Sequence, residues 1–235
     1  MKRMQKGFTL VEIAIVLVII GLLLGGILKG QEMITQAKIK NVVADFSGIS
    51  AAYYGYQDRY RAIPGDDQGA TARWAGAVQS VAPLAGNGVV SGTYNNACPV
   101  PLVAASPESC MWWDHLRRAG FVAGSGGGQP FNAVAGMLGV QTGDGQTPTG
   151  PALGGAAGVG GFASLIVCSA NLPDKIAIAV DTQMDDGVRN TGTVRGQLQA
   201  GPNPDIVADA TAAAAGGAGS YVESGTNTYT LCRSL

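Results

Sequence analysis

The most constraining feature of this sequence is an apolar run near the N-terminus that contains a single carboxylate. From Phe8 to Leu28 the only charged residue is Glu12. A run of about 21 residues is long enough to cross a bilayer as a helix. A carboxylate in such a helix costs about 2.5–3.5 kcal/mol near the bilayer centre and less near the end, where Glu12 lies. We therefore expect Glu12 to have a function that compensates this cost.

The residues on either side of the run favour a retained membrane span over a cleaved secretory signal peptide. Lys2, Arg3 and Lys6 precede it, as in a signal peptide, but the segment 29–32 (Lys-Gly-Gln-Glu) follows it where a small-residue cleavage site would stand. By the positive-inside rule, the short basic N-terminus stays in the cytoplasm and the remainder of the chain is exported.

The helical pattern continues beyond the apolar run. Apolar side chains recur there at alternating spacings of three and four residues, which predicts one buried stripe along a helix, formed by Ile39, Val42, Phe46, Ile49, Tyr53, Tyr56 and Tyr60. Pro64 should end this helix near residues 60–62. We expect one helix over about residues 8–62, with an apolar half (8–28) and an amphipathic half (29–62). The bulky tyrosines favour packing against the chain's own sheet over a coiled-coil seam.

Residues 63–235 are expected to form one loop-rich globular head. Glycine supplies 36 of the 235 residues, about twice its average usage, and charged residues are only 13%. The head therefore lacks the basic face of a nucleic-acid-binding domain. Short patterned runs predict helices at 111–120 and 173–184 and strands at 162–168, 191–200 and 229–232, whereas 124–161 is expected to be mostly loop.

The four cysteines are expected to form disulfides, because their number is even and the predicted topology places them in an oxidising compartment. Cys98 and Cys110 flank a short proline-rich loop. Cys168 ends an apolar strand-like run, and Cys232 lies close to the C-terminus. Of the three possible connectivities, we favour Cys98–Cys110 with Cys168–Cys232.

The head shows no constellation that indicates catalysis. His115 is the only histidine, and no nucleophile or second metal ligand stands near it in sequence, so a helix-surface or supporting polar role is expected. Asp181, Asp185 and Asp186 offer oxygen ligands that Ca²⁺ prefers. Their spacing does not match an EF-hand loop, and aspartates at a helix end are common turn formers. No other cofactor is expected.

The segment Gly7–Ile13 resembles the class III signal of type IV prepilins and type II secretion pseudopilins. The shared features are a short basic leader ending in Gly7, Phe8 directly after it, Glu12 at the fifth position beyond that point and an unbroken apolar span. The resemblance implies that an inner-membrane prepilin peptidase removes residues 1–7 and that Phe8 is then N-methylated. It also implies an α+β pilin-like fold, in which the C-terminal half of the long helix packs on a small antiparallel sheet within a disulfide-stapled head.

These features together predict a structural subunit and not an enzyme. The resemblance implies that the chain polymerises through its N-terminal helix into a type IV pilus or a type II secretion pseudopilus, and that Glu12 neutralises the Phe8 amine of a neighbouring subunit. The implied partners are the prepilin peptidase, identical or homologous pilin subunits, an inner-membrane assembly platform and the lipid bilayer, with no nucleic acid.

The implied location is the bacterial inner membrane, with a cytoplasmic N-terminus and a periplasmic head, and afterwards a filament at the cell surface. Two alternatives remain open from the sequence. In the first alternative, the chain is a membrane-anchored periplasmic binding module that uses its helix only as an anchor. In the second, it is an adhesive or minor pilin at a filament tip.

Overall fold

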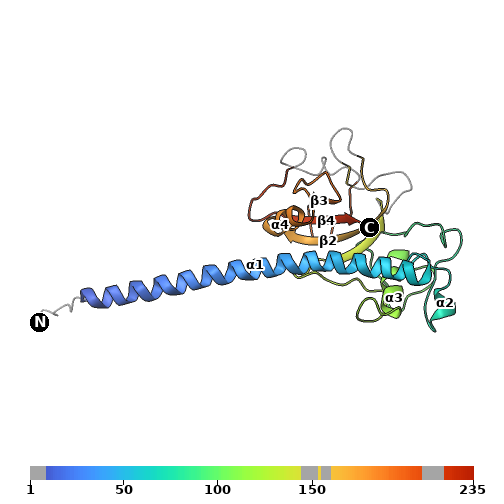
Figure 1. Cartoon of the computed structure of the whole chain (residues 1–235), viewed down its shortest axis with the longest axis horizontal. Helices are drawn as coiled ribbons and strands as arrows, with labels where there is room; N and C mark the ends of the chain where they lie inside the picture. Colours follow the sequence, from blue (N-terminus) through green and yellow to red (C-terminus); the bar gives the residue numbers. More distant parts are fainter. Residues whose placement is uncertain (1–8, 144–152, 155–159, 208–219) are drawn as a thin grey trace, which may run out of the picture. The chain divides into compact units, whose positions relative to one another are not determined.

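A computed structural model describes residues 9–143, 153–154, 160–207 and 220–235. It contains a long first helix, three shorter helices and a four-stranded sheet (Figure 1). In chain order these are α1 (Leu10–Tyr60), α2 (Ala70–Arg73), α3 (Glu108–Arg118), β1 (Leu138–Thr142), β2 (Leu165–Pro173), α4 (Asp174–Met184), β3 (Val194–Leu198) and β4 (Thr228–Ser234). The chain divides into two compact units between Lys38 and Ile39.

Helix α1 is continuous and ends where Pro64 predicts. The predicted helix over residues 8–62 is two residues longer at its C-terminal end than the observed one, and Phe8 lies outside the described residues. Arg61 leaves the helix with a φ of 54°, and its N–H still reaches the Gln57 carbonyl. Among the described residues, burial along α1 begins at Ile39, eleven residues beyond the end of the predicted apolar half at Leu28.

The C-terminal half of α1 packs on the sheet through the predicted apolar stripe. Its buried members are Ile39, Val42, Phe46, Ile49, Tyr53 and Tyr56, joined by Ala52. They share one core with Trp112 of α3 and with sheet residues such as Val140 and Leu231. The structure therefore confirms packing within the chain and places this stripe in the core of the head.

The sheet is antiparallel throughout, with strand order β1-β2-β4-β3. Because side chains alternate along a strand, β2 contributes side chains to both faces of the sheet. Leu165 and Val167 join the core under α1, whereas Ile166 and Cys168 join a second cluster that includes Tyr94, Phe162 and Ile206. Both faces are thus covered, which explains why β2 reads as a continuous apolar run.

Strand β1 is an element that the sequence analysis did not predict, within the segment 124–161 that was expected to be mostly loop. Leu138 pairs with Ser169 and Val140 with Val167, which makes β1 one edge of the sheet. Its sequence, Leu-Gly-Val-Gln-Thr, is short and carries a glycine that strand propensity disfavours. Gly139 is nevertheless required, because a side chain there would collide with the Tyr94 carbonyl. Strand β1 depends on the close approach of the Gly139 and Tyr94 backbones, and that contact is not visible in the local sequence.

Apart from the short helix α2, which the sequence analysis did not predict, the other head elements match the predictions with shifted boundaries. Helix α3 begins three residues before the predicted start, behind Pro107, and ends through Gly120, whose φ is +81°. A glycine in this conformation is a common helix stop. Helix α4 begins directly after Pro173, as predicted, and strands β2, β3 and β4 overlap the three predicted runs.

Both predicted disulfides are present. Cys98, which precedes α3, is bonded to Cys110 within α3, 12 residues further along the chain. Cys168–Cys232 joins the neighbouring strands β2 and β4 and connects residues 64 positions apart in the sequence. Each bond therefore restrains a different part of the head.

The longer link should stabilise the head more. Replacing Cys168 and Cys232 together by serine should lower the free energy of unfolding by about 4 kcal/mol, against about 3 kcal/mol for the Cys98 and Cys110 pair, because the larger loop gains more entropy in the unfolded chain. Urea unfolding of the full chain in detergent, followed by tryptophan emission, measures both. An equal or reversed order would contradict this account.

Candidate functional site

The start of α1 is fixed by a capping box formed by Thr9 and Glu12. The Thr9 backbone N–H and its hydroxyl both donate to Glu12 Oε2 at 2.8 Å, and the Glu12 N–H donates to Thr9 Oγ1 at 3.3 Å. A Thr-x-x-Glu sequence satisfies two otherwise unpaired donors at a helix N-terminus. Thr9 was not singled out from the sequence, although this local spacing is a known helix-start signal.

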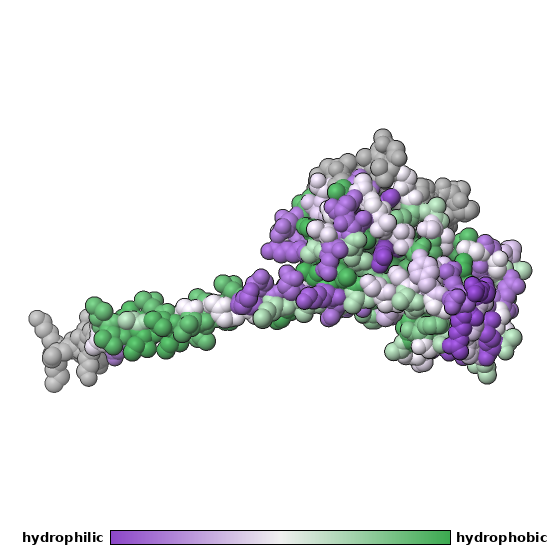
Figure 2. Space-filling view, viewed as in Figure 1, coloured by the Kyte–Doolittle hydropathy of each residue, from purple (hydrophilic) through white to green (hydrophobic). Residues whose placement is uncertain are grey.

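The first half of α1 presents apolar side chains on all sides. Leu10, Leu17, Leu22 and Leu28 are each at least 65% exposed, and no residue in the most apolar 18-residue window is buried. Figure 2 shows this half of the helix covered by hydrophobic residues. It is long and apolar enough to cross a membrane, as predicted.

Glu12 is therefore the one ionisable side chain in the apolar part of α1, and its own chain compensates it only in part. Both bonds from Thr9 reach Oε2, whereas Oε1 accepts no hydrogen bond from any described residue. A carboxylate in apolar surroundings is costly unless it is paired. The geometry thus leaves one oxygen free to accept a donor from outside the chain.

Comparison with known proteins agrees with this geometry. Residues 2–28 match the family model described as the prokaryotic N-terminal methylation motif. The N-terminus is a prepilin-type signal. No curated protein and no solved structure matches the chain. The chain combines this signal with a pilin-like α+β fold and two disulfides. The predicted processing residues of the signal, Gly7 and Phe8, lie outside the described residues.

Beyond the prepilin-type signal, His115 has a different role from the helix-surface position allowed by the sequence. Its ring is fully buried. Nδ1 accepts the Gly65 N–H at 3.0 Å, so Nε2 carries the proton and donates to the Val78 carbonyl at 2.7 Å. Gly65 has a φ of +87°, and a Cβ there would lie 2.5 Å from the Glu108 carbonyl oxygen. His115 therefore fastens two loops to α3.

The turn that follows α1 is held by two buried carboxylates. Asp66 accepts the Gly86 and Gly88 N–H groups, and Asp67 accepts the Tyr56 hydroxyl at 2.5 Å and pairs with Arg73. These two carboxylates thus serve as acceptors that close the loop onto α1.

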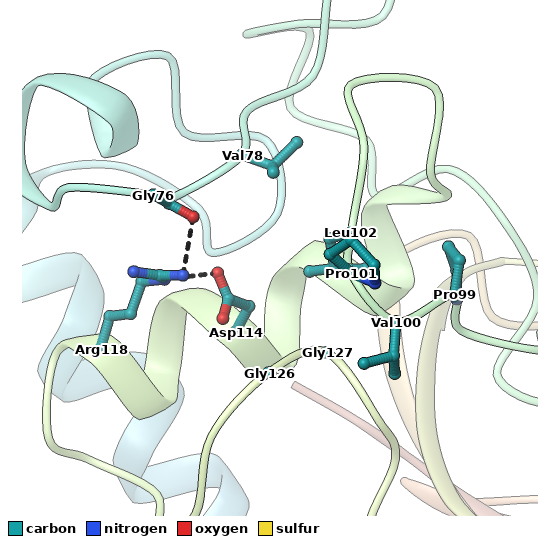
Figure 3. Close-up of a pocket in the computed structure, with 10 residues that line it drawn as sticks. All are labelled: Gly76, Val78, Pro99, Val100, Pro101, Leu102, Asp114, Arg118, Gly126 and Gly127. Carbon is teal, nitrogen blue, oxygen red and sulfur yellow. Dashed lines mark hydrogen bonds and ion pairs between the residues drawn. The ribbon is translucent and has the colours of Figure 1, made fainter.

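A hollow of about 240 Å³ lies between α3, the Cys98–Cys110 loop and the segment around Gly76 (Figure 3). One wall is apolar and runs from Pro99 to Leu102. On the polar side, Arg118 Nε pairs with Asp114 at 2.6 Å, and the other guanidinium nitrogens donate to the Ala75 and Gly76 carbonyls. The charged groups of this hollow are therefore already engaged in holding loops.

The three predicted calcium candidates come together in the fold. A carboxylate oxygen from each of Asp181, Asp185 and Asp186 lies within 4.8 Å of the other two. Tyr221, forty residues from Asp181, completes this corner by donating its hydroxyl to Asp181 Oδ2 at 2.5 Å. No sequence signal identified Tyr221, because the contact depends on the sheet topology.

Acid should weaken the head through His115. Burial, the largest cause, lowers the pKa of this imidazole below its usual value. The unfolded chain, with a histidine pKa near 6.5, then binds more protons than the folded one. The stability that depends on neutral His115 is therefore complete above about pH 6.5 and declines as the pH falls towards the folded-state pKa, by at most about 1.4 kcal/mol per pH unit.

The measurement is urea unfolding between pH 7.5 and 5 for the wild type and for His115→Gln, whose amide retains a donor and an acceptor. The variant should show a smaller loss of stability over this range, since all carboxylates titrate alike in both proteins. Identical pH profiles would show that His115 does not titrate in this way.

Proposed function

We propose that this chain is a structural subunit, cleaved between Gly7 and Phe8, N-methylated at Phe8 and polymerised through α1 into a type IV pilus or a type II secretion pseudopilus. The observation that carries the proposal is the coincidence of a prepilin-type signal over residues 2–28 with an exposed apolar helix that continues into a pilin-like head. A prepilin peptidase, other pilin subunits and an inner-membrane assembly platform are the partners that this role requires.

The proposed route begins in the bacterial inner membrane. Lys2, Arg3 and Lys6 keep the leader in the cytoplasm, and the head crosses to the periplasm. The apolar half of α1 is then solvated by lipid until neighbouring helices replace the lipid in a filament. Removal of the leader takes away all three cations and creates a new amine at Phe8.

Glu12 supplies the proposed assembly contact. Its Oε1 accepts no hydrogen bond from the described residues, and the Phe8 amine of a neighbouring subunit is the complementary charge. An ion pair in apolar surroundings is sensitive to the removal of either partner, at a cost of about 3–5 kcal/mol. A helix used only as an anchor has no need for this carboxylate, which favours a subunit over a membrane-anchored binding module.

Mass spectrometry of filaments sheared from the cell surface tests processing and assembly together. We expect an N-terminal peptide that begins at Phe8 and carries one added methyl group. A chain found only at full length in the membrane fraction would point to a plain anchor. A processed chain at trace level among abundant other subunits would point to a minor or tip pilin.

A charge-specific variant tests Glu12. In Glu12→Gln the amide oxygen still accepts the capping bonds from Thr9, but the charge is lost, so filament yield should fall at least about tenfold, equivalent to about 1.4 kcal/mol. Glu32→Gln is the matched control, because Glu32 lies on the same helix and forms an exposed pair with Lys29. Filament yields are compared after confirming normal cleavage. Wild-type yield from processed Glu12→Gln would refute the pairing.

A further inference from the structure

Three carboxylates come together at the corner of the head where α4 leads into the turn before β3. Asp181 lies in the last turn of α4, and Asp185, the first residue after the helix, donates its N–H to the Asp181 carbonyl at 2.7 Å. Asp186 follows in the turn itself. One oxygen from each lies within 4.8 Å of the others.

Two of these carboxylates are held in place by the backbone of the turn. Asp185 Oδ2 accepts the Val194 N–H at 2.8 Å and also the Thr193 N–H. Asp186 Oδ1 accepts the Val188 N–H at 2.8 Å. Backbone hydrogen bonds of the turn therefore fix two like charges close to each other.

No cation of the described residues pairs with this group. The buried Arg189 acts electrostatically on Tyr221, the hydrogen-bond partner of Asp181, and Arg195 acts on Asp185 and Asp186. The Arg195 guanidinium instead donates to the Leu153 and Gly160 carbonyls at 3.0 and 2.6 Å and packs over Phe162. Within the described ranges, the three carboxylates have no ion pair shorter than 4 Å.

Asp181 provides a second and independent observation. The residue is fully buried, Oδ2 accepts the Tyr221 hydroxyl, and Oδ1 has no hydrogen-bond partner among the residues that the structure describes. Burial, the largest cause, raises the pKa of Asp181 to about 6. A buried carboxylate oxygen without a partner carries an uncompensated desolvation cost. Such an atom beside two further carboxylates indicates that a ligand of positive charge belongs there.

We propose that Asp181, Asp185 and Asp186 bind one Ca²⁺ ion, with water and backbone carbonyls completing its shell. The donors at this corner are all oxygen, which suits a hard cation. The four cysteines are all in disulfides and the single histidine, His115, lies in the core, so no thiolate or imidazole ligand is available at this corner for zinc. Calcium also tolerates irregular geometry better than magnesium, which demands a near-ideal octahedron.

Bound calcium would join three parts of the head: the end of α4, the turn before β3 and, through Asp181, the segment at Tyr221. This inference does not rest on the proposed filament role, because it concerns only the head. Loss of calcium binding and loss of assembly are therefore measured separately.

The test is isothermal titration of the full chain in detergent, stripped with EDTA and then titrated with CaCl₂ or MgCl₂. We expect one Ca²⁺ per chain with a dissociation constant of about 1 mM or tighter, as in extracellular calcium modules, and weaker binding of Mg²⁺. Asp185→Asn and Asp186→Asn should each weaken calcium binding at least about tenfold, because each removes a charged ligand. Asp58→Asn, at an exposed position of α1 outside the cluster, should bind as the wild type does.

Circular dichroism establishes that each variant is folded. Asp185 also holds the turn, so Asp186→Asn, at an exposed position, keeps the test decisive if Asp185→Asn does not fold. A folded wild type without saturable Ca²⁺ binding up to about 10 mM, above the range of extracellular modules, overturns the proposal. Unchanged affinity in folded Asp186→Asn also overturns it.

Discussion

The packing of the α1 stripe on the sheet is the interaction on which the rest of the head depends. Ile39, Phe46 and Tyr56 lie on one face of α1, and the sheet, α3 and α4 all contribute to the same core. This face is buried by its own chain, so it is not available to a coiled-coil partner. The N-terminal apolar half of α1 remains exposed, whereas the stripe on its C-terminal half is covered by the head. The two halves of one helix therefore lie in different environments.

Much of this arrangement could be predicted from the sequence because its causes are local. The alternating spacing of the stripe, the helix stop before Pro64 and the glycine after α3 depend on residues close together in the chain. The two disulfides followed from their flanking residues. Strand β1 and the contact between Asp181 and Tyr221 could not be predicted in this way, since each depends on segments that meet only in the folded head.

The functional residues show the same difference between features with local causes and features that depend on the folded head. Glu12 is conspicuous in the sequence because of its charge, yet its partner Thr9 was overlooked although both belong to a helix-start motif. Two aspartate pairs with similar sequences also have different environments. Asp66 and Asp67 receive backbone, hydroxyl and guanidinium donors from three segments, whereas the corner at Asp181 retains a buried oxygen without a partner. Composition alone does not distinguish these two environments, because each depends on the hydrogen-bond donors that surround the carboxylates in the fold.

The capping box has a consequence for the charge at the tip of α1. The aligned peptide dipoles place about half a positive charge at a helix N-terminus. A chain cut after Gly7 has only Phe8 ahead of the capping residue Thr9, so its new ammonium group stands at this already positive pole. The Glu12 Oε2 oxygen is engaged with Thr9. In the proposed processing, cleavage after Gly7 exchanges the three leader cations for a single ammonium group next to this positive pole, and a carboxylate of another molecule is its complementary charge.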